Sequence, residues 1–218
     1  ILESGNFFTV VPWNKYDVIW GVNGLSVKRS FNGIFNSIFS ESGYHEVLFP
    51  SLIEESHFNK QNIHYRDLKS ISYKIQGEDK YLRPTSESQV AQYISSSPSI
   101  ESEMKLFQIC SVFRKEKANN TFPLIRAIEI DPFLESMTFS EDSLKLMNKE
   151  IHLYKEFFDE LCIPYLELIR PVWDTFPEAI STYAFDTYVK NIGWVQIGSI
   201  HNLGNAFTNA FEIKYNNN

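Results

Sequence analysis

The sequence contains three short stretches whose residue types suit ligand binding. The first, FRKE at residues 113–116, places Arg114 and Glu116 two positions apart, so both side chains project from one face if the segment is a strand. An arginine fork beside a carboxylate suits a ligand with a phosphate and hydrogen-bond donors, and ATP is such a ligand. A surface ion pair on an ordinary strand explains the same residues, so this motif needs support from the rest of the chain.

The other two stretches lie on either side of the first. LRPTSES, residues 82–88, contains Thr85 and Glu87, which by themselves are explained as the cap of a following helix. GSIHNLGNAF, residues 198–207, places His201 after a tight Gly-Ser turn, where a histidine is often a capping or core residue. Each stretch therefore has an ordinary structural explanation when it is taken alone.

An antiparallel hairpin is predicted around FRKE. An apolar, β-branched and aromatic run that begins at Gln108 is typical of a strand, residues 117–121 are a polar, Asn-rich turn, and residues 122–130 alternate as a second strand. We expect the rest of the chain to be organised around this hairpin.

Helices and further strands follow from the hydrophobic pattern. Apolar residues at helical spacing predict amphipathic helices over residues 24–43 and 140–162, the second with Ser140 as its amino-terminal cap, and a helix through residues 90–94. Residues 1–16 are expected to form an entry arm or short edge strand, and residues 54–69 a helical or irregular segment. Further strands are predicted at residues 44–50, 70–75, 80–83, 163–168, 185–189 and 194–198.

Composition sets outer limits on the fold and its setting. With 218 residues, 43% hydrophobic and 15% aromatic, the chain is expected to form a single domain over residues 1–218 with a proper core. Cys110 and Cys162 both lie in apolar sequence, which argues against a disulfide framework or a thiolate metal site and fits a reducing, cytoplasmic setting. No stretch predicts a membrane span or a signal peptide. The net charge of −7 neither supports nor excludes nucleic-acid binding.

Taken together, the three stretches resemble the catalytic domain of class II aminoacyl-tRNA synthetases in their order and separations, and within that class the prolyl enzymes of the archaeal and eukaryotic type. The resemblance covers about residues 13–215. It implies an α+β fold, a largely antiparallel sheet flanked by helices. The helix over residues 24–43 and the strand that Pro50 ends resemble motif 1, which implies a homodimer through that region.

The resemblance also implies roles for particular residues. Thr85 and Glu87 would receive the secondary amine of proline, which is chemically reasonable because a hydroxyl and a carboxylate can accept both of its hydrogens. ATP would bring Mg²⁺ through its phosphates with no protein metal site, and the partners would be proline or another small amino acid, ATP and tRNA. The implied ATP-binding residues are Arg114 on the α-phosphate as the catalytic residue, Glu116, Arg126 and Gln196, and the implied amino-acid-binding residues are Thr85, Glu87, Glu135, Phe176, Ser199 and His201.

Several positions depart from the family pattern. Ile128 stands where a second arginine is expected, Met137 where a histidine is expected, and Glu178 where the family has glycine, while Ile200 and Ala206 also differ. Glu178, Ile200 and Met137 would change the size or charge of the amino-acid pocket, so proline should bind weakly and an amino acid with a second positive group as well or better.

Two functional interpretations remain open at this stage. The chain ends at Asn218, before the motif 3 arginine of the family, so as an enzyme we expect it to be a weak proline-activating catalyst. The alternative is a non-catalytic module that uses the same fold to dimerise or to hold a tRNA or protein partner.

Overall fold

The computed structural model describes residues 5–11, 14–61, 68–96, 103–115, 129–175 and 179–214. Three of the expected site residues, Glu116, Arg126 and Phe176, lie outside these ranges. The same holds for the predicted turn at residues 117–121, for most of the predicted strand at residues 122–130, and for Ile128 and Glu178.

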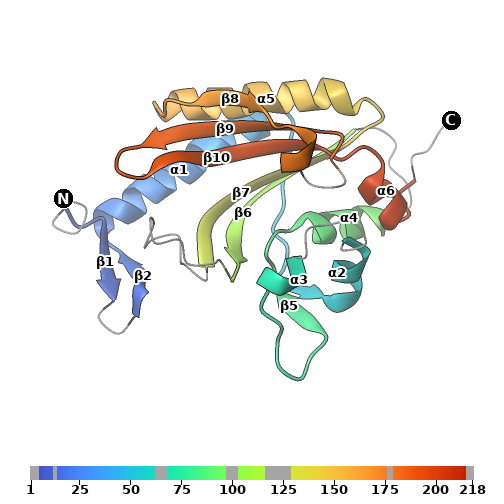
Figure 1. The fold of residues 1–218 in the computed structure, drawn as a ribbon, viewed down its shortest axis with the longest axis horizontal. Coiled ribbons are helices and arrows are strands. Elements are labelled where there is room, and N and C mark those ends of the chain that lie inside the picture. The colour runs from blue at the N-terminus through green and yellow to red at the C-terminus, as the bar shows by residue number, and fades with distance from the viewer. Residues whose placement is uncertain are drawn as a thin grey trace.

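The first half of the chain forms a hairpin, a long helix and a small mixed unit (Figure 1). The hairpin was predicted only as an entry arm or edge strand, and Gly24 allows its close approach to the helix, because a Cβ there would lie 2.0 Å from the Phe7 carbonyl oxygen. The elements are β1 Phe8–Val11, β2 Asn14–Trp20, α1 Val22–Glu41, β3 His45–Glu46, β4 Leu52–Glu54, α2 Glu55–Gln61, α3 Leu68–Ile71, β5 Lys80–Leu82 and α4 Glu87–Ser95.

The second half supplies the longest strands and the second long helix (Figure 1). These elements are β6 Met104–Phe113, β7 Glu129–Phe139, α5 Ser143–Glu160, β8 Leu166–Ile169, the 3-10 turn η2 Val172–Asp174, β9 Ser181–Val189, β10 Gly193–Asn202 and α6 Ala206–Ala210. Antiparallel pairing dominates, with strand orders β10-β9-β8 and β3-β6-β7 in the two larger sheets. The predicted α+β architecture of antiparallel sheet and helices is confirmed.

The predicted central pairing is present as β6 and β7. These strands pair antiparallel from Met104 opposite Phe139 to Phe113 opposite Glu129, so β7 continues well past the predicted strand end at Ile130. The register shifts between Cys110 and Val112. This irregularity accommodates Pro132 within β7, because proline has no N–H to give to a regular ladder.

Strand β6 separates two apolar clusters, because alternate side chains of a strand point to opposite faces. Leu106 packs with Val90 of α4 in a cluster that also includes Phe139. Phe107 packs on the other side with Phe35 of α1 in a cluster that continues onto α5. In Figure 1, α1 and α5 accordingly lie on the far side of the strands from α2 and α4. Each face of β6 therefore contributes to one of the two clusters.

The helix predicted over residues 24–43 is confirmed as α1, with Gly43 at φ +82° after its end. The strand predicted at residues 44–50 is wrong beyond Glu46. Its backbone stays beside β6, but the Phe49 N–H donates to the side chain of Gln108 at 3.4 Å, and the Phe49 carbonyl accepts from Arg83 at 2.6 Å. Side chains thus replace the ladder partners that a strand would use.

The strand predicted at residues 70–75 is also wrong. Residues 68–71 are the short helix α3, and only Lys74 forms a β-bridge, to Tyr81. The predicted turn between the two arms is present, with Gly77 at φ +82°. The segment predicted as a strand at residues 70–75 is therefore irregular after α3, apart from the bridge at Lys74.

Helix α5 confirms the predicted long amphipathic helix but begins at Ser143. Its cap is Asp142, whose side chain accepts from the Lys145 N–H at 3.1 Å, and not Ser140, which accepts from the Asp142 N–H. Of the two cysteines, Cys110 is buried as expected, whereas Cys162 is exposed. Both are free thiols.

Three strands follow α5. Strand β8 lies at 166–169, shifted from the prediction, and the pair β9–β10 is confirmed and is longer than predicted. In the part of the chain that the structure describes, no helix is long and apolar enough to cross a membrane.

Candidate functional site

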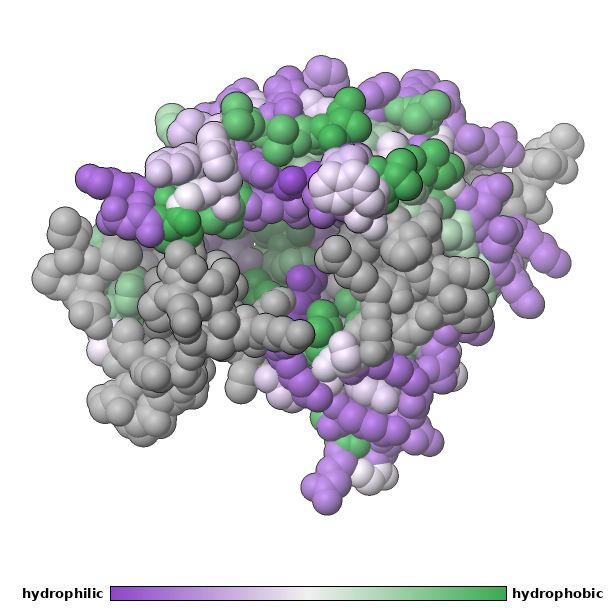
Figure 2. All heavy atoms as spheres, in the orientation of Figure 1, coloured by the Kyte–Doolittle hydropathy of each residue, from purple (hydrophilic) through white to green (hydrophobic). Residues whose placement is uncertain are grey.

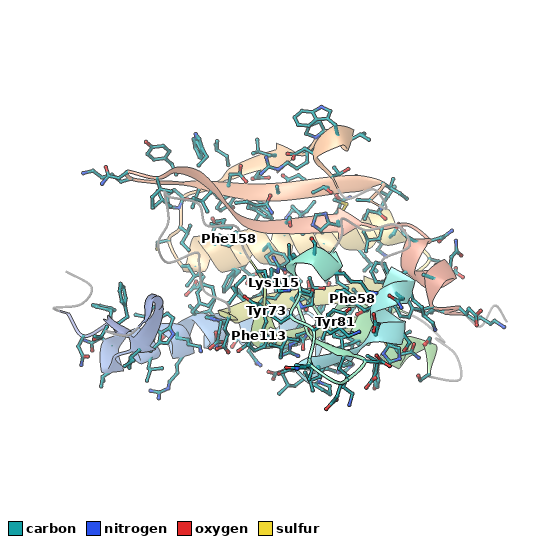
Figure 3. All side chains as sticks on the ribbon, turned by 60° about the horizontal axis from the view of Figure 1, so that its bottom comes forward. Phe58, Tyr73, Tyr81, Phe113, Lys115 and Phe158 are labelled. Atoms are coloured by element: carbon teal, nitrogen blue, oxygen red, sulfur yellow. The ribbon has the colours of Figure 1, made fainter. Side chains whose placement is uncertain are left out.

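The end of β6 is attached to the LRPTSES segment by backbone hydrogen bonds. The Phe113 N–H donates to the Arg83 carbonyl at 2.8 Å, and the Lys115 N–H donates to the Ile71 carbonyl at 2.6 Å. The Lys115 ammonium also lies 5.2 Å from the centre of the Tyr73 ring, as Figure 3 shows. These contacts bring residues that are about 30 to 44 positions apart in the chain to one place.

Arg114 follows directly after β6 and reaches back to the same segment. Its Nε donates to the Pro84 carbonyl at 2.8 Å, and its guanidinium lies 5.1 Å from the centre of the Phe133 ring. The other guanidinium N–H groups have no hydrogen-bond partner among the described residues. Because β6 ends at Phe113, the expectation that Arg114 projects from within a strand is wrong. The relation of Arg114 to Glu116 falls outside the described residues.

Thr85 and Glu87 lie side by side at the start of α4. The Thr85 hydroxyl donates to Oε2 of Glu87 at 3.3 Å, and Thr85 is 7% exposed. The predicted helix after this turn is confirmed, yet Ser86 at the cap position makes no side-chain capping bond. The backbone of this turn is held instead by another strand.

That strand is β7, through Glu135. Both carboxylate oxygens of Glu135 lie 3.1 Å from the backbone nitrogen of Ser86, between Thr85 and Glu87. Oε2 of Glu135 also accepts from the Gln108 amide at 3.0 Å. The structure therefore brings Glu135 to the Thr85–Glu87 turn, where its carboxylate accepts from the Ser86 backbone and the Gln108 side chain.

Two buried residues that sequence reasoning missed support this arrangement. Arg83 is 3% exposed, and its guanidinium donates to the carbonyls of Ser111 at 2.8 Å and Phe49 at 2.6 Å. Gln108 is 2% exposed and joins Phe49 to Glu135. The register shift next to Ser111 leaves its carbonyl available to Arg83. No local pattern in the sequence signals these partners, because they come from distant segments.

On β10, His201 is held between two hydroxyl groups. Its Nδ1 lies 2.9 Å from the Thr182 hydroxyl, and its Nε2 lies 3.0 Å from the Ser199 hydroxyl. Burial lowers the pKa of His201 from 6.5 to about 4, so the ring is neutral at pH 7. Gly198 and Ser199 lie within β10, next to a register shift, so the predicted tight turn before His201 is wrong.

Gln196, on the same strand, has a different set of partners. Its side-chain oxygen accepts from Nη2 of Arg170 at 3.2 Å, and the same Nη2 donates to Asp186 at 2.7 Å. Because the side-chain oxygen of Gln196 faces Arg170, its amide nitrogen points away from Arg170 and Asp186 and can donate elsewhere. Arg170 and Asp186 were not foreseen from the sequence.

Ser199 and His201 point away from α5. Ile200 between them is 5% exposed and belongs to the apolar cluster that includes Phe158 of α5, so its neighbours on the strand face the opposite side. Ile200 is thus a core residue, and the expectation that it reshapes the amino-acid pocket is wrong. Met137 packs against the other cluster, which includes residues of α4.

The face of the molecule that Figure 2 shows is hollowed below the β9–β10 layer and over the β6–β7 hairpin.

The arrangement offers complementary chemistry around one turn. A hydroxyl and a carboxylate, on Thr85 and Glu87, can accept hydrogens from an ammonium, and the guanidinium of Arg114 can donate to a phosphate. Within the described ranges no three His, Cys, Asp or Glu side chains gather as a metal site requires.

Comparison with known proteins identifies the family. The family model of the tRNA synthetase class II core domain (G, H, P, S and T) matches residues 71–218. A proline–tRNA ligase of Pyrobaculum calidifontis is 34% identical over 225 residues, which cover 99% of this chain and 46% of that protein. The corresponding enzyme of Methanopyrus kandleri is 36% identical over 229 residues, covering 99% and 47%. The chain thus spans about half the length of these curated relatives.

Solved structures agree with the sequence comparison. The prolyl-tRNA synthetase of Giardia lamblia, in complex with prolyl-adenylate, superimposes with a TM-score of 0.85 at 26% identity, covering 98% of this chain and 45% of that one. The prolyl-tRNA synthetase of Cryptosporidium parvum, complexed with L-proline and AMP, has a TM-score of 0.83 at 17% identity over 99% of this chain and 46% of its own, and supports the fold. Since the family model covers more than half of its residues, the chain belongs to the class II tRNA synthetase core domain family.

Proposed function

We propose that this chain is the proline-activating core of a proline–tRNA ligase. The observation that carries the proposal is the junction of Thr85, Glu87 and Arg114, in which an ammonium-accepting pair and a phosphate-binding guanidinium are joined through the Pro84 carbonyl. The names of the relatives and the prolyl-adenylate of the Giardia lamblia structure support the same substrates.

The proposed reaction is an in-line displacement at phosphorus. A carboxylate oxygen of proline forms a bond to the α-phosphorus of ATP, and the bond from that phosphorus to the bridging oxygen breaks, so pyrophosphate leaves with its electron pair. No covalent protein intermediate and no general base are required, so the protein contributes position and charge neutralisation. Arg114 would neutralise charge on the α-phosphate, and Gln196 would donate its amide hydrogen to the nucleotide.

Thr85 and Glu87 would hold the amino acid by its ammonium. Glu87 accepts one of the two hydrogens of the proline nitrogen and the Thr85 oxygen accepts the other. His201, whose low pKa of about 4 keeps it neutral, adds no positive charge that would repel the ammonium. The neutral ring, held by Thr182 and Ser199, would form part of the pocket wall.

Further parts of the proposal concern partners and assembly. Magnesium would be held by the ATP phosphates, where it supplies charge neutralisation, and no protein ligand set for it is proposed from the described residues. The prolyl group would then pass from the adenylate to a hydroxyl group of tRNA, with AMP leaving, in the cytoplasm, where translation takes place. Residues 1–218 would act as a single domain that dimerises through α1 and the segment after β3. The side chain of Leu48 there is 74% exposed, which is consistent with a subunit contact.

The test is amino-acid-dependent exchange of pyrophosphate into ATP, together with thermal-shift measurements in the presence of ATP and each of the twenty amino acids. All twenty are needed because Glu178 stands where the family has glycine. We expect proline with ATP to raise the thermal midpoint, and Arg114→Ala to abolish the effect of ATP. A chain that no amino acid stabilises, and that binds no ATP at millimolar concentration, would contradict the proposed function.

A further inference from the structure

A partly buried chain of hydrogen bonds links β6 and β7 to the turn that carries the two ammonium-accepting groups. The Ser86 N–H donates to the Glu135 carboxylate, with 3.1 Å from the nitrogen to each oxygen. Gln108, directly opposite Glu135 in the strand pairing, donates its amide to Oε2 at 3.0 Å. The Gln108 oxygen accepts from the Phe49 N–H at 3.4 Å, which fixes the orientation of the amide.

Among the described residues, the carboxylate of Glu135 accepts hydrogen bonds from Ser86 and Gln108. Ser86 is 0% exposed and Gln108 is 2% exposed, while Glu135 has intermediate exposure, so the donors of these bonds are sheltered from water. Ser86 also lies between Thr85 and Glu87 in the chain, so the position of its amide sets the separation of the Thr85 hydroxyl and the Glu87 carboxylate. A shift of the Ser86 amide would therefore move both ammonium acceptors together.

We propose that Glu135 and Gln108 are positioning residues for the amino acid. They act through the Ser86 amide and hold Thr85 and Glu87 at the spacing that accepts two hydrogens of a secondary ammonium, and Glu135 itself does not contact the substrate. This inference rests on the proposed function. It differs from the expectation drawn from the family resemblance, in which Glu135 binds the amino acid directly.

The hydrogen-bond pattern makes each single substitution disruptive in a defined way. In Glu135→Gln, an amide nitrogen replaces one carboxylate oxygen, and it meets either the Gln108 amide nitrogen or the Ser86 N–H, so two donors face each other. If Gln108 turns over to relieve this clash, its nitrogen meets the Phe49 N–H instead. In Gln108→Glu, two carboxylates face each other in a buried site.

Exchanging the two side chains gives every donor an acceptor again, although one of the two Ser86 contacts is then made by the amide nitrogen. In the double variant Glu135→Gln, Gln108→Glu, the new carboxylate at 108 accepts from the Phe49 N–H and from the new amide at 135. The oxygen of that amide accepts from the Ser86 N–H. The number of charges is unchanged, but the carboxylate has moved from β7 to β6. The double variant thus separates the hydrogen-bond pattern from the location of the negative charge.

The first measurement is proline binding by calorimetry at saturating ATP analogue, for the parent chain, both single variants and the double variant. One unpaired buried donor typically reduces an equilibrium constant roughly tenfold or more, so each single variant should bind proline at least that much more weakly. The double variant should return to within about threefold of the parent, which is the scale of one neutral hydrogen bond. The matched control is Glu46→Gln, which alters an exposed carboxylate bonded to the Asn36 amide and should leave proline binding unchanged. If the double variant binds proline as weakly as Glu135→Gln, the negative charge of Glu135 acts on the amino acid directly and the inference is overturned.

A second measurement does not depend on any ligand. The hydrogen-exchange rate of the Ser86 amide, followed by NMR, should rise in Glu135→Gln and return in the double variant. If the exchange rate of Ser86 is the same in the parent and in Glu135→Gln, Glu135 does not hold that amide and the inference fails. A parent chain that does not bind proline would contradict the proposed function, while the Ser86 exchange rates would still decide the positioning role.

Discussion

Arg83 provides the sharpest test of how the site is held together. Its guanidinium is buried, and Arg83→Met keeps much of the side-chain volume but removes the donors to the carbonyls of Ser111 and Phe49. The Pro50 carbonyl, 3.4 Å from Arg83, keeps its bond from the Gln89 amide at 2.8 Å, so two partly buried acceptors, the Ser111 and Phe49 carbonyls, lose their partner.

The expected cost follows from those two acceptors. Each buried, unsatisfied polar group costs about 1–3 kcal/mol, so we expect Arg83→Met to lower the free energy of unfolding by about 4 kcal/mol. Arg83→Lys should lose about half as much, because an ammonium can reach one carbonyl but not present a fork to two. Arg29, which is exposed on α1, provides the matched control, and Arg29→Met should change stability by less than about 0.5 kcal/mol.

Urea unfolding at pH 7, followed by circular dichroism, measures these differences. A loss below about 1 kcal/mol in Arg83→Met would refute the reasoning, because it would mean that water or other donors satisfy both carbonyls. The same result in Arg83→Met and Arg29→Met would refute it equally.

Three further predictions concern ligand binding, pH and assembly. Arg114→Ala should abolish magnesium-dependent ATP binding by calorimetry and should lower the free energy of unfolding by only about 1–3 kcal/mol, because the single Pro84 carbonyl loses its donor. Undetectable ATP binding by the unmodified chain at millimolar ATP would contradict the nucleotide role. Burial lowers the pKa of His201 from 6.5 to about 4, so the unfolded chain gains a proton before the folded chain as the pH falls from 6.5 to 4. The free energy of unfolding should therefore decrease over this range, and the decrease should be smaller in His201→Gln than in the parent by up to about 3 kcal/mol. Urea unfolding at pH 4.5 and pH 7 measures the difference. Parallel pH profiles for the two chains would exclude that linkage. Light scattering should show a dimer that Leu48→Asp dissociates, and a monomeric parent at hundred-micromolar concentration would contradict the subunit contact at this exposed side chain.

Elements with a local signal could be predicted from the sequence. Helix α1 was found because Phe35 and Phe39 recur at helical spacing and are both fully buried, and Gly43 follows its end. The β9–β10 pair was found because two apolar runs flank a short turn. The exact cap of α5 was missed because Ser140 and Asp142 are both good capping residues, and the choice between them depends on backbone geometry.

Elements that depend on distant partners could not be predicted. Residues 47–50 carry the composition of a strand, but the Phe49 backbone bonds to the side chains of Arg83 and Gln108, far away in the sequence. The order of the three motifs was enough to recognise the family, which the family model confirms. It did not reveal that Glu135 faces the Ser86 amide or that Arg170 faces Gln196, because neither contact has a local sequence signal.

The position of β6 between the two apolar clusters has a consequence for how the chain melts. Leu106 belongs to one cluster and Phe107 to the other, so both clusters share strand β6. Loss of packing in one cluster would therefore expose the strand on which the other cluster packs. We therefore expect the two clusters to unfold as one cooperative unit with a single heat-absorption peak, rather than as two subdomains that melt in turn. A ligand held at the Thr85–Glu87 turn, next to only one of the clusters, then raises the melting temperature of both, including α1 and α5 on the opposite face.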